Sequence, residues 1–171
     1  MTTPDFEIWQ TTNQEPWVTA MCDRIIQFKT RMKRVTVKPG TPVFLHASTK
    51  LWPAHADLVH PAMRNLLDFE MDRLKSNMGH ILAVGIVSDI MPIRDVPMEE
   101  WGPWETNWGG TRYCVADYAW YCTPLHVLNK PVPARGFQAP FCRAKPEVIQ
   151  LAYRKNPGLK QKIVEMVAKA A

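Results

Sequence analysis

The chain has 171 residues and a formal net charge of +5; 46% of its residues are hydrophobic and 22% are charged. This is the composition of an ordinary globular protein, and the length fits one domain with appended helices. A chain of this size buries roughly 70% of its unfolded surface, so that folding needs neither a disulfide framework nor a structural metal.

The sequence offers no membrane segment. The N-terminal residues, MTTPDFEIW, contain neither the basic region nor the apolar region of a signal peptide. The longest apolar run, Ile81 to Val87, is far too short to cross a bilayer. We therefore expect a soluble, cytoplasmic protein with no membrane partner.

The cysteines and histidines give little sign of a metal site. The four cysteines form no C-x-x-C pair, which indicates reduced and mostly buried thiols in a cytoplasmic chain. The nearest approach to zinc-ligand spacing is His55, Asp57 and His60, which is a weak candidate. We expect no bound metal and no cofactor.

The first 31 residues predict an arm or strand followed by a helix. Residues 1–15 fit a short strand with apolar anchors, and Pro16 suits a first helical position. Apolar residues then recur at helical spacing and predict a helix of about three turns. They are Trp17, Ala20, Met21, Ile25 and Phe28.

A basic segment overlaps the end of this helix. Arg24 to Lys38 holds six cations and no acid, and the rest of the chain sums to −1. Its β-branched residues from Gln27 to Val37 favour a twisted strand. Cations on ordered elements favour a site for a polyanion or a phosphorylated ligand. From charge alone, a solvated strand and turn explains them equally well.

The middle of the chain alternates strands and a helix. After a Pro39-Gly40 turn, Thr41 to Ser48 predicts a strand. Pro61 opens a helix that Gly79 ends. His80 to Ile90 is the strongest strand, and its unbroken apolar run predicts burial on both faces.

A long loop and two further strands are expected next. Residues 91–111 are rich in proline and glycine and predict a long loop. Its tryptophans either serve a function or anchor the loop to the core. Tyr113 to Tyr121 predicts a strand that Thr123-Pro124 breaks. Asn129 to Arg143 predicts an extended edge strand and closing turn.

Two basic helices are expected at the end of the chain. One starts at Pro146 and breaks at Pro157-Gly158, and the other spans Leu159 to Ala170. From Arg143 onward there are seven cations and two acids. Convergence of this segment with residues 24–38 on one face would form a groove that tracks a nucleic-acid backbone.

Four motifs in order resemble the ASCH domain, a member of the PUA-like β-barrel superfamily. They are Pro16-Trp17, PGTPVFLHAS (39–48), ILAVGIVSD (81–89), and YAWY (118–121) followed by KPVPARGFQ (130–138). The resemblance covers about residues 5–145. It implies an α+β fold: a PUA-like small mixed β-barrel with flanking helices over residues 1–145. The basic helices of residues 146–171 would be an extension packed on it.

The signature of that family, G-x-K-x-x-E-x-R, leaves two alignments open. Keeping the spacing from Trp17 places Arg24 at the glycine and Ile26 at the lysine. A shift of three residues places Lys29 at the lysine and Met32 at the glutamate. Neither alignment keeps the acid.

Binding of single-stranded RNA or a modified nucleotide is the function that we expect. Cations of the barrel mouth would contact phosphate, an aromatic residue would stack on a base, and Gln138 or Asp89 would read its edge. Trp120 lies in a strand and fits a core position as well. The candidate ligand-binding residues are Lys29, Arg31, Arg34, Trp52, Tyr118, Trp120, Arg135 and Gln138.

Two alternatives remain open. The first is a metal-independent hydrolase, either a ribonuclease or an amidohydrolase of an N-acylated cytidine nucleoside. The resemblance implies a lysine with a nearby hydroxyl or carboxylate for this chemistry, here Lys29, Thr30 and Asp89. The second is a protein-interaction adaptor that uses the terminal helices and the loop tryptophans, Trp101, Trp104 and Trp108.

Overall fold

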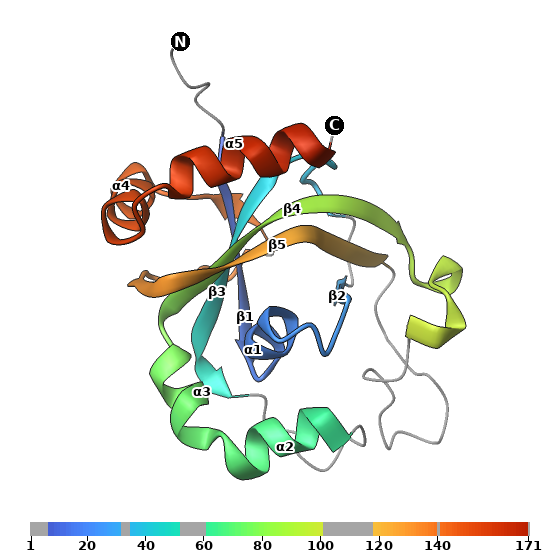
Figure 1. The fold of residues 1–171 in the computed structure, drawn as a ribbon. Coiled ribbons are helices and arrows are strands. Elements are labelled where there is room, and N and C mark those ends of the chain that lie inside the picture. Colours follow the sequence, from blue (N-terminus) through green and yellow to red (C-terminus); the bar gives the residue numbers. More distant parts are fainter. Residues whose placement is uncertain (1–6, 32–34, 52–60, 101–117, 140, 171) are drawn as a thin grey trace.

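The computed structural model describes residues 7–31, 35–51, 61–100, 118–139 and 141–170, and they form a curled, mixed sheet with helices on both faces (Figure 1). The strand order is β2-β5-β4-β3-β1-β6. β1 and β3 are parallel, and the other neighbouring pairs are antiparallel. The strands are β1 (Trp9–Glu15), β2 (Phe28–Arg31), β3 (Pro42–Leu51), β4 (His80–Pro92), β5 (Tyr118–Pro133) and β6 (Cys142–Arg143).

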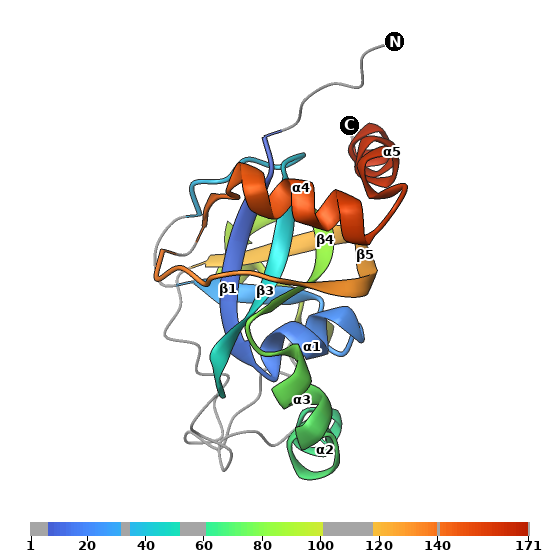
Figure 2. The same cartoon turned by 90° about the vertical axis from the view of Figure 1, so that its left-hand side faces the viewer.

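The expected α+β class is therefore confirmed, and the sheet curls into a half-barrel (Figure 1). Side chains alternate along β3: Val43 and Leu45 pack into one core, and Phe44 packs into the other. Figure 2 shows α1 (Trp17–Cys22), α2 (Pro61–Phe69) and α3 (Met71–Asn77) at one end of the molecule. At the opposite end lie α4 (Pro146–Lys155) and α5 (Leu159–Ala170).

The prediction of a three-turn first helix is wrong. α1 ends at Cys22, because Arg24 adopts a left-handed conformation with φ 58°. The Ile25 N–H donates to the Ala20 carbonyl oxygen, and the Arg24 N–H donates to that of Met21. This is the Schellman arrangement that ends a helix, and glycine usually occupies its left-handed position. Phe28, expected on the helix, is instead a fully buried residue of β2.

The expected strands of the middle segment are confirmed as β3 and β4. Residues 81–87 of β4 are all buried, as their unbroken apolar run predicts for a strand covered on both faces. The helix expected between Pro61 and Gly79 forms as two helices, α2 and α3, which meet at Glu70. Gly79, with φ 74°, precedes β4 as expected.

The prediction that Thr123-Pro124 breaks a strand is also wrong, because β5 runs through it. Gly85 pairs with Leu125 and Val87 with Cys122, so two residues of β5 oppose Ile86 alone. This is a β-bulge, where a proline costs no ladder hydrogen bond. β2 pairs with β5 only as far as Tyr121, so the other edge of β5 needs no donor from Pro124 either.

The two C-terminal helices form as predicted. Three apolar residues of α5, Leu159, Ile163 and Met166, are buried in one core with Ile81 and Ile86 of β4. Ile8 and Ala144 belong to the same core. Residues on both sides of the predicted boundary at 145 therefore pack together.

Two short 3-10 turns, Ile93–Asp95 and Met98–Glu100, follow β4. Among the helices of the described ranges, none combines the length and the apolarity that crossing a bilayer requires.

Candidate functional site

A pocket of about 360 Å³ lies between α4 and the segment that leaves β5. We call this segment, residues 134–137, the strap. Figure 2 shows α4 across one end of β1 and β3, with the orange chain after β5 beside it. The volume falls within the range of small-molecule sites. The lining residues are Pro133, Ala134, Arg135, Phe137, Lys145, Glu147, Val148, Leu151 and Arg154.

The lining combines three cations with one acid around an apolar floor. Arg135 comes from the strap, Lys145 precedes α4, and Arg154 lies in its last turn. All three are exposed, whereas Phe137, like Val148 and Leu151, is half-buried. Cations around an apolar patch match a ligand that carries both an anion and a flat or apolar group.

Polar side chains beneath the strap hold its backbone in place. Gln10 donates from Nε2 to the Arg135 carbonyl oxygen at 3.0 Å. Thr12 accepts the N–H of Phe137 on Oγ1 at 3.2 Å, and His46 Nε2 bonds the Ala134 carbonyl oxygen at 2.9 Å. Three of the four strap residues are therefore fixed through their main chain.

His46 acts as a hydrogen-bond donor in this arrangement. A carbonyl oxygen only accepts, so the proton lies on Nε2 and the imidazole donates to Ala134. His46 is 1% exposed, and burial lowers its pKa. Its Nδ1 and the Oε1 of Gln10 have no hydrogen-bond partner among the described residues.

The candidate residues of β2 lie far from this pocket along the sheet, at the edge opposite β6. Lys29 pairs with Trp120, and its Nζ lies 4.4 Å from the centre of the Trp17 ring. This cation–π contact places the ammonium group against a core residue. Of Arg31 the structure describes only the backbone, which pairs with Tyr118, while Arg34 and Trp52 lie outside the described residues.

The proposed catalytic group Lys29, Thr30 and Asp89 is divided by the sheet. Lys29 pairs with Trp120, which pairs with Ile90, so these three residues share one face. Asp89 is one residue away from Ile90 and therefore faces the other side, where Thr30 also lies. Asp89 is exposed and accepts the N–H of Ile90. The strand pairing therefore does not support the expectation that Lys29 and Asp89 share one cavity.

Trp120 is a core residue and not a stacking surface. It is 0% exposed and packs edge-on against Phe141, with ring centres 5.0 Å apart. Tyr118 is half-buried at the start of β5, and Gln138 is exposed directly after the strap. Of the predicted ligand-binding residues that the structure describes, Arg135 is the one that lines the pocket.

The pocket residues of α4 escaped the sequence analysis as a group, although a local signal existed. Glu147, Leu151 and Arg154 follow the i, i+4, i+7 spacing that places residues on one face of a helix. The sequence offered no sign that the strap would lie against this face.

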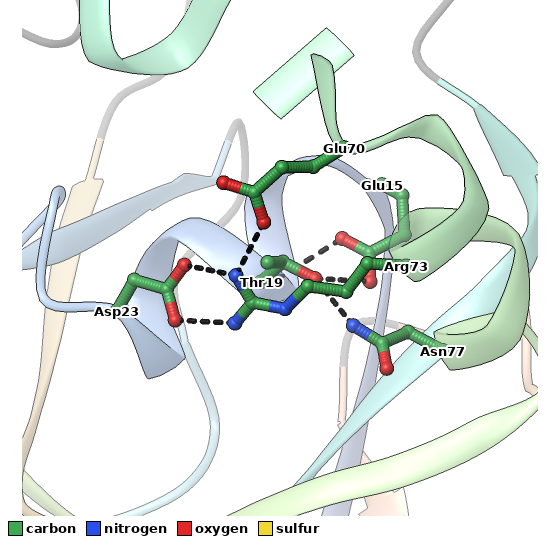
Figure 3. A network of polar contacts seen from close by, with 6 residues as sticks. All are labelled: Glu15, Thr19, Asp23, Glu70, Arg73 and Asn77. Atoms are coloured by element: carbon green, nitrogen blue, oxygen red, sulfur yellow. Dashed lines mark hydrogen bonds and ion pairs between the residues drawn. The ribbon is translucent and has the colours of Figure 1, made fainter. Parts of the chain in front are cut away.

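A polar network between α1 and α3 is a second feature that the sequence analysis missed (Figure 3). Glu15 accepts the N–H of Thr19 at 3.1 Å and its hydroxyl at 2.7 Å, and Asn77 donates to that hydroxyl at 2.9 Å. Nearby, Arg73 of α3 binds Asp23 and Glu70. The network joins α1 to α3.

Glu15 is the buried carboxyl of this network. It is 0% exposed, and burial raises its pKa, while the hydrogen bonds from Thr19 oppose that rise. Its position directly before α1 lets it accept a backbone donor at the helix start. We assign it a structural role.

The conformation of Arg24 bears on the two open alignments of the ASCH signature. The unshifted alignment places Arg24 at the glycine, and Arg24 holds the left-handed conformation that glycine adopts most readily. The choice between the two alignments stays a prediction, and so does the unshifted alignment itself. In it, the lysine position is taken by Ile26, which is 3% exposed.

The described residues contain no group of three or more His, Cys, Asp or Glu side chains that could hold a metal ion. The weak candidate His55, Asp57 and His60 lies outside them. No protein-family model matches the chain, and no curated protein matches it either. The resemblance to ASCH domains stays a prediction.

Proposed function

We propose that the protein binds single-stranded RNA or a modified nucleotide in the pocket between the strap and α4. The observation that carries the proposal is the placement of Arg135, Lys145 and Arg154 around one apolar cavity. Two of these cations belong to the basic C-terminal segment, and the third comes from the strap. The PUA-like assignment of the half-barrel is part of the same proposal.

The cations would contact phosphate, and the apolar part would contact a base. A guanidinium group binds phosphate through two parallel hydrogen bonds, which favours Arg135 and Arg154 as the phosphate ligands. The half-buried ring of Phe137 offers a surface for stacking. Glu147 opposes an anion by its charge and would favour an amino or imino group of a base.

The test is the affinity for a short, fluorescently labelled single-stranded RNA. We expect Arg135→Ala with Arg154→Ala to weaken binding at least about tenfold, or roughly 1.4 kcal/mol. Both side chains are exposed, so the double variant should remain folded.

The matched control removes two cations elsewhere. Arg64 of α2 and Lys75 of α3 are exposed and lie at the opposite end of the molecule (Figure 2). The variant Arg64→Ala with Lys75→Ala has the same net charge as the pocket variant. Equal losses of affinity in both would mean that the overall charge binds RNA, and the pocket proposal would fail.

The alternatives gain less from the geometry. A hydrolase that uses Lys29 together with Asp89 is not proposed, because they lie on opposite faces of the sheet. For the adaptor hypothesis, Trp101, Trp104 and Trp108 lie outside the described residues. Its other elements are the two terminal helices, of which α5 already packs Leu159 and Ile163 against β4.

A further inference from the structure

The strap is held from beneath by three side chains of two neighbouring strands. Thr12 of β1 pairs with His46 of β3, so both project from the same face of the sheet, and Gln10 lies two residues before Thr12 on that face. Their hydrogen bonds reach the backbone of Ala134, Arg135 and Phe137. These bonds fix the main chain on both sides of Gly136.

Gly136 lies at the centre of the strap, so close to Thr12 and His46 that little room is left for a side chain. A Cβ atom added there would lie 3.0 Å from His46 Cε1 and 3.0 Å from the Thr12 methyl group. Contacts this short are tighter than ordinary packing, so a larger residue would push the strap away from β1 and β3. The strap therefore rests directly on Thr12 and His46, two of the three side chains that hydrogen-bond to it.

Gln10, Thr12, His46 and Gly136 do not line the pocket. The strap residues that they support, Ala134, Arg135 and Phe137, do line it. We propose that Gln10, Thr12, His46 and Gly136 are positioning residues that set where Arg135 and Phe137 stand relative to α4. This inference rests on the proposed function. It predicts that changes hidden beneath the strap alter RNA affinity without touching the ligand.

Thr12 gives the cleanest pair of variants. Thr12→Val keeps the shape and removes the acceptor of the Phe137 N–H, whereas Thr12→Ser keeps the hydroxyl. We expect Thr12→Val to speed hydrogen exchange of the Phe137 amide about tenfold and to weaken binding of the labelled RNA about fivefold. Thr12→Ser should restore both.

Two further variants keep the test sharp if Thr12→Val unfolds. Gly136→Ala should weaken RNA binding about fivefold, because it displaces the strap. His46→Gln keeps an amide donor near the Nε2 position, so it should retain more affinity than His46→Leu. Circular dichroism and thermal unfolding show which variants stay folded.

The results separate the two proposals. Unchanged Phe137 exchange in Thr12→Val would overturn the positioning inference, whether or not RNA binds. Faster exchange with unchanged RNA affinity would overturn it as well. If the wild-type protein failed to bind the RNA, the proposed function would fail, and the exchange measurement would still decide whether Thr12 anchors the strap.

Discussion

The two basic segments of the chain are nearly equal in net charge and differ in what the fold does with them. Residues 24–38 carry six cations, and one of them, Lys29, lies over the ring of Trp17 in the core. Residues 143–171 carry seven cations, and two of them line a pocket that Arg135 completes. The charge of a sequence segment shows where cations are concentrated along the chain. Whether they line a pocket depends on which elements pack together in the fold.

The two segments differ because the polar groups around them make different contacts. On the side of α1, polar and charged groups are tied into structural contacts such as the Glu15–Thr19–Asn77 network (Figure 3). At the strap, polar side chains such as Gln10 hydrogen-bond to the backbone on the side away from the pocket, and the side chain of Arg135 stays exposed. The first region therefore stabilises the fold, and the second is the region that we propose presents cations to a ligand.

The largest effect that would test this division is on stability near α1. Thr19→Val removes the hydroxyl that links Glu15 to Asn77 and leaves a buried carboxyl with one donor fewer. We expect the free energy of unfolding to fall by about 1–3 kcal/mol, measured by urea denaturation. RNA affinity should not change, and a parallel loss of affinity would break the division between the two regions.

The second effect is on the salt dependence of RNA binding. Phosphate contacts by all three pocket cations, Lys145 included, predict a slope of about −2 in a plot of log K against log salt, since each contributes about −0.7 for a single strand. A threefold increase in salt should then weaken binding about tenfold. In Arg135→Ala with Arg154→Ala the slope should fall to about −0.7. A slope that the variant leaves unaltered would remove the pocket cations from the interface.

The third effect sharpens the structural role of Lys29. Lys29→Ala removes the contact with the Trp17 ring and should cost about 0.5–1 kcal/mol of unfolding free energy. Lys29→Met keeps an apolar stem on the ring and isolates the contribution of the charge. Affinity for RNA should stay within about twofold. A tenfold loss would instead return the binding site to β2, as the sequence alone suggested.

The smallest effect is the pH dependence that a single histidine adds. Burial lowers the pKa of His46 below its ordinary 6.5, so the unfolded chain takes up a proton more readily. The contribution of His46 to stability is therefore complete above pH 6.5 and decreases as the pH falls below it. His46→Gln should flatten this decrease in urea unfolding curves recorded at several pH values.

The contribution of Glu15 to stability changes with pH in the opposite direction to that of His46. Comparing the wild type with His46→Gln separates the two contributions. Its pKa is raised from 4.5, so its contribution is present below pH 4.5 and is lost as the pH rises through the folded-state pKa. If His46→Gln kept the full acid sensitivity of the wild type, the histidine would not be its source.

Elements with local start and stop signals were predicted well. The unbroken apolar run of β4 and the Pro and Gly punctuation of α4 and α5 lie within their own segments. The predictions failed where the local conformation depends on contacts with another part of the chain. Arg24 takes a conformation that its side chain does not predict, and Pro124 is accommodated by a bulge that requires the register of β4.

The site shows the same limit. Arg135 was selected from a motif and does line the pocket, whereas Trp120 was selected from the same stretch of chain and is fully buried. Periodicity assigns alternate faces of a strand, but it does not say which face meets solvent. The approach of the strap to α4 depends on Gln10, Thr12 and His46, which lie about 90 or more residues before it.

The most direct test of the central claim is a titration of isotope-labelled protein with the short single-stranded RNA, followed residue by residue by NMR. The account predicts that the largest chemical-shift changes occur in the strap and in residues 145–154 of the pocket wall. Large changes confined to β2, with the strap and α4 unaffected, would contradict it.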